Sequence, residues 1–391
     1  MTVRPARTSL LALIVGAILL TLLVPASAPA APRPAPSTWM PKAGPAFNTP
    51  IGDSDQQRRL LNRVISATGH ATPGSTIRMA VFSFGDPETA DALLAAYQRG
   101  VNVKLVFSGS NDYPAMQRLQ AGIGDDITKP SFVVFCDRSC RGTRGEMHAK
   151  YFAFSHTGAA HWVTMVGSVN LTQYNAQKQW ADLYVKVADR PYYVAYRHWF
   201  AQLKRDEPVD PTFVRRSVGD TQIEMTPTDT GTETDPVADA LSRIRCEVPM
   251  GEIDPDSETP DDLVLTRLDI SAHAWNEERG KRLAWQVVGL YQAGCLVRVF
   301  YGVGMGAAVK AILENNGIET SNGTHKGIYT HQKMMVVSGG YDGLPSTVRA
   351  WTGSHNWSDL ALGRDDLIVE VENQADAQRY ADRFRWMWNH A

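Results

Sequence analysis

The chain has 391 residues, of which 43% are hydrophobic and 20% charged. This length and composition suit two ordinary domains or one large two-lobed domain with a substantial core. The formal net charge is −2, and removing the first thirty residues, which hold two Arg and no acid, gives 37 − 41 = −4. The chain has no strong excess of basic residues of the kind that a nucleic-acid-binding surface usually carries. Nucleic acid is therefore the less favoured partner, although it is not excluded.

The first thirty residues predict a secretory signal peptide and therefore an extracellular protein. Arg4 and Arg7 precede an apolar run from Leu10 to Val24, and small residues follow it. A membrane anchor is the alternative, but fifteen apolar residues fall short of the roughly 20 that a spanning helix needs. Residues 31–46, rich in Pro and Ala, are expected to form a flexible leader.

Four cysteines in an exported chain favour structural disulfides. Cys136 and Cys140 lie in one short segment that can close a small ring, which leaves Cys246 and Cys295 to pair. A zinc site is a poor alternative, because this spacing does not match the usual ligand patterns.

The predicted elements occur twice in the same order, and the segment from Tyr97 to Phe107 returns as Tyr291 to Tyr301. A strand, a helix, a Gly turn and a second strand are typical of a parallel crossover, so we expect two pseudo-symmetric α/β sandwich lobes, 47–217 and 218–391. The junction is expected within 217–234, and an exposed loop over 251–262. In the first half we expect a strand end at 47–50, a helix at 55–67, a strand at 77–84, a helix at 88–99 and a strand at 101–107. In the second half we expect a strand end at 224–227, a helix at 235–246, a strand at 265–272, a helix at 276–293 and a strand at 295–301.

Each half also contains a His-x-Lys unit, a Gly-Ser-x-Asn unit and an acidic strand, in that order. On a strand, residues i and i+2 face the same side, so each His lies beside its Lys. Ammonium and amide groups can stabilise the negative charge of a reacting phosphodiester without a metal or cofactor. The predicted catalytic residues are His148, Lys150, Asn170, His331, Lys333, Asn356, Asp182 and Asp366.

Two histidines allow two roles in one reaction: one forms a phosphohistidine, and the other protonates the leaving oxygen and then activates water. Asp182 and Asp366 are expected to orient the imidazoles, with Asp365 as an alternative to Asp366. Among the remaining histidines, His355 lies between Ser354 and Asn356, and His273 follows an expected strand end and is a candidate to line the cleft, although a packing role is favoured for both.

With its duplicated motifs, the whole mature chain resembles the phospholipase D superfamily. The resemblance implies that Ser168 and Ser354 join the phosphate site, that His148 is the nucleophile and that His331 is the general acid, although the reverse order stays open. The superfamily's motif aspartates are replaced by Ser155 and Ser338.

We therefore expect a secreted phosphodiesterase that hydrolyses phospholipid head groups and visits the membrane surface transiently as a monomer. Trp357, carried by the second Gly-Ser-x-Asn loop, is the candidate lipid contact. The alternatives are a secreted endonuclease with the same chemistry and a lipid- or phosphate-binding protein with weakened turnover.

Overall fold

The computed structural model describes residues 1–3, 38–228, 235–249 and 263–391. The expected signal peptide, most of the expected leader and the expected loop over 251–262 lie outside these residues. Ser37–Ala391 form one compact unit. Within the described ranges, no helix is both long enough and apolar enough to cross a membrane.

The first half is built on a seven-stranded mixed sheet. Its central strands β2 and β3 are parallel and joined by a helix, as the crossover pattern predicts, whereas β5 runs antiparallel to β2. The strands in spatial order are β1 (Gly44–Phe47), β8 (Asp182–Lys186), β6 (Ala160–Gly167), β5 (Lys150–Thr157), β2 (Thr76–Val81), β3 (Asn102–Ser108) and β4 (Phe132–Cys136).

The second half repeats this strand order, with one extra strand at the edge and β11 (Ile244–Arg245) paired to β18. The predicted two-lobed α/β class is therefore confirmed. In the same direction as above the strands are β9 (Val214–Val218), β10 (Thr221–Met225), β20 (Leu367–Val371), β19 (Leu344–Gly353), β18 (Lys333–Tyr341), β14 (Arg267–Trp275), β15 (Leu296–Met305) and β16 (Glu319–Ser321). A separate hairpin pairs β12 (Glu247–Pro249) with β13 (Leu263–Leu265).

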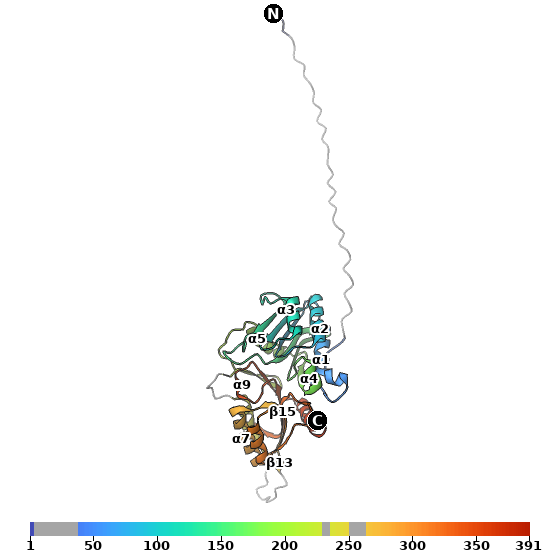
Figure 1. The fold of residues 1–391 in the computed structure, drawn as a ribbon. Coiled ribbons are helices and arrows are strands. Elements are labelled where there is room, and N and C mark those ends of the chain that lie inside the picture. The colour runs from blue at the N-terminus through green and yellow to red at the C-terminus, as the bar shows by residue number, and fades with distance from the viewer. Residues whose placement is uncertain (4–37, 229–234, 250–262) are drawn as a thin grey trace. The chain divides into compact units, whose positions relative to one another are not determined.

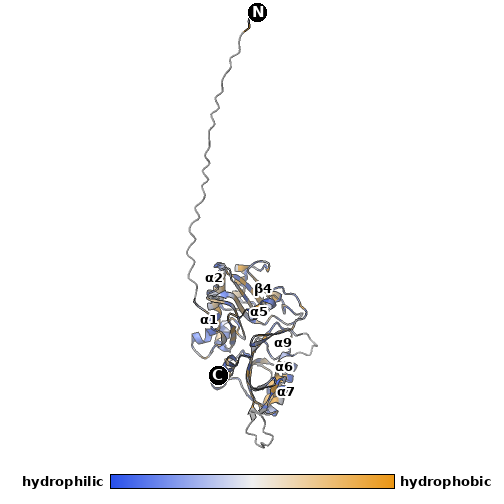
Figure 2. Ribbon diagram, turned by 180° about the vertical axis from the view of Figure 1, so that it is seen from behind, coloured by the Kyte–Doolittle hydropathy of each residue, from blue (hydrophilic) through white to orange (hydrophobic). Residues whose placement is uncertain are grey.

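Helices cover both outer faces, and two long helices lie in the layer between the sheets (Figure 1). One apolar cluster contains residues of both sheets together with α5 (Arg190–Leu203) and α10 (Gln374–His390), so the two halves share a core. The outer helices α1 (Ser54–Gly69) and α7 (Glu277–Gln292) each bury one face, and α1 is largely hydrophilic (Figure 2). The other helices are α2 (Pro87–Gln98), α3 (Pro114–Ile123), α4 (Gln173–Lys178), α6 (Pro236–Ser242), α8 (Ala307–Asn315) and α9 (Asp359–Leu362).

Three expected boundaries differ from the structure. Strand β1 begins at Gly44, inside the expected leader, because residues 44–47 pair with β8. Strands β9 and β10 form a hairpin that takes up most of the expected junction, and β9 pairs within the second sheet although it was assigned to the first half. Helix α6 ends at Ser242, where the chain turns into the short strand β11.

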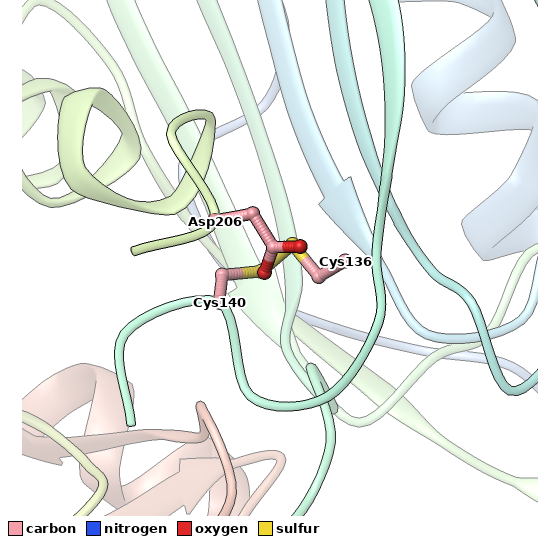
Figure 3. Close-up of side chains that lie close together, drawn as sticks. All are labelled: Cys136, Cys140 and Asp206. Atoms are coloured by element: carbon pink, nitrogen blue, oxygen red, sulfur yellow. A yellow bond between two sulfur atoms is a disulfide. The ribbon is translucent and has the colours of Figure 1, made fainter. Parts of the chain in front are cut away.

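Both predicted disulfides are present, Cys136–Cys140 and Cys246–Cys295. Asp206 lies beside the first of them, with its carboxylate and the two sulfur atoms within 4.8 Å of one another (Figure 3). Because a metal is bound by thiolates and these sulfurs are bonded to each other, the cluster does not form a metal site while the disulfide is intact.

Candidate active site

The two His-x-Lys units meet at one place, because each is held by the opposite half of the chain. The backbone N–H of His148 donates to the carbonyl of Asp365 at 3.0 Å. In the same way, the N–H of His331 donates to the carbonyl of Trp180 at 2.8 Å. Strands β7 (Gln179–Trp180) and β17 (Tyr329–Thr330) pair in parallel next to this contact. The pairing of the halves therefore brings both units into one site.

The side chain of His148 contacts a carboxylate from the other half. Its Nδ1 lies 2.8 Å from Oδ1 of Asp366, and both side chains are buried. A carboxylate accepts a hydrogen bond, so Nδ1 carries the proton and Nε2 keeps its lone pair. Burial, and next the neighbouring ammonium of Lys150, lower the pKa of His148 well below its usual value. The geometry gives a neutral, oriented imidazole, which is the form that can attack phosphorus.

The second histidine has a different partner. Nδ1 of His331 lies 2.8 Å from the carbonyl oxygen of Ser168, and Nζ of Lys333 lies 3.4 Å from its Nε2. Burial first, and then Lys333, lower the pKa of His331 well below its usual value. Since its Nδ1 partner is a carbonyl and not a carboxylate, His331 lacks the anionic support that His148 has.

The two lysines are buried beside the histidines. Each Nζ donates to the backbone carbonyl of the histidine two residues earlier, and Nζ of Lys150 also lies 5.0 Å from the centre of the Phe82 ring. Burial lowers the pKa of Lys150 to about 7, and burial followed by repulsion from Lys150 lowers that of Lys333 well below its usual value. A bound anion would favour the charged form of both lysines, so this pair of side chains suits an anionic ligand.

The two Gly-Ser-x-Asn units supply further polar groups. The Oδ1 atoms of Asn170 and Asn356 are buried, and the described residues offer them no hydrogen-bond partner. Since buried polar atoms normally have partners, these amides are candidates for ligand contacts. The hydroxyl of Ser168 instead donates to the carboxylate of Asp182, and that of Ser354 donates to the carboxylate of Asp366, each at 2.5 Å. These two serines therefore position the carboxylates.

Asp182, which was expected to orient one of the two imidazoles, has other partners in the structure. Within the described ranges, Asp182 accepts hydrogen bonds from Ser168, Thr352 and Tyr380 and not from His331. The reason is a one-residue difference in register: Gly167 pairs with Leu183, whereas Gly353 pairs with Ile368.

Asp182 therefore corresponds in the sheets to Leu367, and Asp366 precedes that position by one residue. A shift of one residue along a strand reverses the direction of the side chain. The side chains of the two aspartates consequently point in different directions and have different partners, although their sequence contexts are alike.

Asp365 does not take the place of Asp366. Its Oδ2 accepts the N–H of Cys140 at 2.5 Å, and burial raises the pKa of its carboxyl to about 7. The serines that replace the motif aspartates lie along the strands: Oγ of Ser155 accepts the N–H of Thr76 at 2.8 Å, and Ser338 pairs opposite Arg267. In the part of the chain that the structure describes, neither serine forms a hydrogen bond with a histidine or lysine of the site.

Trp357, the expected lipid contact, is packed against another tryptophan and is buried. Its ring centre lies 4.5 Å from that of Trp275, and the side chain is 4% exposed. The ring belongs to the apolar core of the second half. His355 lies behind Asp366, with its Nδ1 3.8 Å from Oδ2 and its Nε2 3.0 Å from Arg279.

His273, for which the sequence favoured a packing role over a place in the cleft, lies beside a histidine of the site. Its ring centre lies 4.4 Å from that of His331, and its Nδ1 lies 3.0 Å from the carbonyl oxygen of Thr330. The signal that could have identified it is its position in the repeated strand, since His273 corresponds to Phe82 in the first half.

Comparisons with known proteins agree with this architecture. Residues 64–204 match the family described as "Cardiolipin synthase, PLD-like domain". Over these residues, in the first half, the chain is thus similar to PLD-like domains. No curated protein matches the sequence.

Among solved structures, the chain is similar to polyphosphate kinase from Porphyromonas gingivalis, with a TM-score of 0.58 and 13% identity over 87% of this chain and 46% of that one. It thus spans about half the length of that kinase. It is also similar to phosphatidylserine synthase from Haemophilus influenzae Rd KW20, with a TM-score of 0.54 and 10% identity over 88% and 86% of the two chains. A shorter match covers 40% of this chain and 92% of Nuc, a phospholipase D family member from Salmonella typhimurium, at 20% identity and a TM-score of 0.27. At these identities the first two likenesses show the fold alone.

Proposed function

We propose that this protein is a secreted phosphodiesterase that cleaves phospholipid head groups through a phosphohistidine on His148. The contact between Nδ1 of His148 and Asp366 carries the proposal, because it makes the two histidines unequal. A neutral imidazole with a carboxylate on Nδ1 suits nucleophilic attack through Nε2.

The reaction follows from the atoms of the site. Nε2 of His148 attacks phosphorus, the bond from phosphorus to the head-group oxygen breaks, and His331 gives that oxygen a proton. Water then attacks phosphorus and passes a proton to His331 as the P–N bond breaks. The two lysines and two asparagines stabilise the equatorial oxygens in both steps. Substrate binding supplies the negative charge that lets His331 hold its proton.

Exposed apolar groups near the site favour a lipid over a nucleic acid. Tyr174 is 56% exposed, and its hydroxyl lies 2.8 Å from that of Tyr329, two residues before His331. Val303 is 68% exposed and follows Gly302, which lies against His273. A site whose surroundings expose apolar side chains, in a chain without basic excess, suits a lipid surface better than a polyphosphate backbone.

The same chemistry would also cleave the phosphodiester bond of a nucleic acid, so an endonuclease is the second candidate function. Purified protein in the presence of EDTA should release head groups from phosphatidylcholine vesicles and leave plasmid DNA intact. Nicking of the plasmid without lipid cleavage would assign the nuclease function. Binding to vesicles without turnover of either substrate would assign the lipid-binding function.

A further inference from the structure

The two halves place different rings against their catalytic histidines. Val81 pairs with Lys150 and Ala272 with Lys333, so Phe82 and His273 hold equivalent positions. The ring of Phe82 lies 4.6 Å from that of His148 at 60°, and the ring of His273 lies 4.4 Å from that of His331 at 56°. The nucleophile therefore has an apolar neighbour, whereas the acid–base histidine has a polar one.

His273 is held with a defined tautomer. The carbonyl of Thr330 accepts a hydrogen bond from its Nδ1, which leaves Nε2 as an acceptor, and Nε2 has no hydrogen-bond partner within the described ranges. Burial, and next the Lys333 ammonium, lower the pKa of His273 to about 3, so the imidazole stays neutral.

The backbone around His273 is specialised for this placement. The pairing of β14 with β15 is irregular between Ala272 and Ala274, and bulges of this kind redirect side chains next to active sites. A Cβ on Gly302 would lie 2.4 Å from the carbonyl oxygen of Thr330 and 3.0 Å from Cα of His273. Glycine at position 302 thus allows the carbonyl to reach the imidazole.

Building on the proposed function, we propose that His273 favours water over an alcohol as the acceptor of the phosphoryl group. His331 serves the oxygen that leaves and the oxygen that later attacks, so a hydrogen-bonding group beside it faces the acceptor. Water has two hydrogens: one passes to Nε2 of His331 as the P–N bond breaks, and the other is donated to Nε2 of His273. A simple alcohol has only one hydroxyl hydrogen, which passes to His331. The Nε2 acceptor of His273 is then left without a hydrogen bond.

The test measures partition between two acceptors in aqueous ethanol. Bis(4-nitrophenyl) phosphate forms a 4-nitrophenyl phosphoryl adduct on His148, which water converts to 4-nitrophenyl phosphate and ethanol converts to ethyl 4-nitrophenyl phosphate. In His273→Phe, which installs the ring of the other half, the ratio of ethyl ester to hydrolysis product should rise on the order of tenfold, the effect of one hydrogen bond. In His273→Gln, whose amide oxygen can accept the same hydrogen bond, the ratio should return towards that of the unsubstituted protein.

Phe82→Leu is the matched control, because it alters the equivalent ring on the nucleophile side and should leave the ratio unchanged. An unchanged or lower ratio in His273→Phe, with adduct still formed, would overturn the proposal for His273 alone. A ratio that rises equally in Phe82→Leu would also overturn it, since general loosening of the site would then be the cause. If the unsubstituted protein forms no phosphohistidine, the proposed function fails and the role of His273 fails with it.

Discussion

Replacing Lys150 by Met should stabilise the protein while it abolishes turnover. The Lys150 side chain is fully buried, and burial is the largest cause of the fall in its pKa from the ordinary 10.5 to about 7. A base whose pKa is lowered by folding binds its proton more tightly in the unfolded chain. Its protonation therefore reduces the free energy of unfolding as the pH falls from 10.5 towards 7, and the full cost is present below that range.

The magnitude follows from the two pKa values. A tenfold change in proton affinity is worth about 1.4 kcal/mol, so the cost is about 5 kcal/mol near pH 6.5 and about 1 kcal/mol near pH 9.5. Methionine has a similar length and no charge, and it can occupy the same space beside Phe82. Lys150→Met should thus unfold at higher urea concentration than the unsubstituted protein near pH 6.5, and the difference should shrink at the higher pH.

Urea unfolding followed by tryptophan fluorescence, without phosphate in the buffer, measures this difference. Inorganic phosphate should stabilise the unsubstituted protein and have a smaller effect on Lys150→Met, because the anion restores the charge of the lysine. Lower stability of Lys150→Met at both pH values would refute the reasoning, since it would show that the ammonium is well compensated without a ligand.

Further substitutions separate the two aspartates and test the longer disulfide. Asp366→Asn should lower turnover by about 100-fold, because it removes the group that orients His148. Asp182→Asn should instead lower the melting temperature, because Asp182 joins strands of both halves through Thr352, and a thermal melt of each variant beside its rate distinguishes the two effects. Replacing Cys246 and Cys295 together by Ser opens a link between residues 49 apart, and should cost about 4 kcal/mol in urea unfolding.

The sequence was sufficient to predict the two-lobed α/β class, because its strand and helix periodicities recur in the same order. It also indicated the residues that the structure brings together around His148 and His331. Both disulfides followed from the pairing of the adjacent cysteines, which left a single remaining pair.

The partners of the two histidines could not be predicted from the motifs. Asp182 and Asp366 both precede a Leu-x-Val segment, and only the sheet register shows that they occupy different positions. Trp357 illustrates a second limit, since a tryptophan beside a catalytic loop can face the core or the site, and here it packs on Trp275. A packing role was favoured for His273 because its place beside His331 depends on the strand pairing that makes it the counterpart of Phe82.

The most direct test of the central claim is the intact mass of His331→Ala after reaction with bis(4-nitrophenyl) phosphate and an acid-free quench. Nitrophenolate leaves without needing a proton, so His148 can still attack, whereas water lacks its base for the second step. The account predicts a 4-nitrophenyl phosphoryl adduct on His148 that persists in His331→Ala and is absent from His148→Ala. An adduct that persists in His148→Ala and is absent from His331→Ala would reverse the assignment, and no adduct in any form of the protein would contradict the phosphohistidine mechanism.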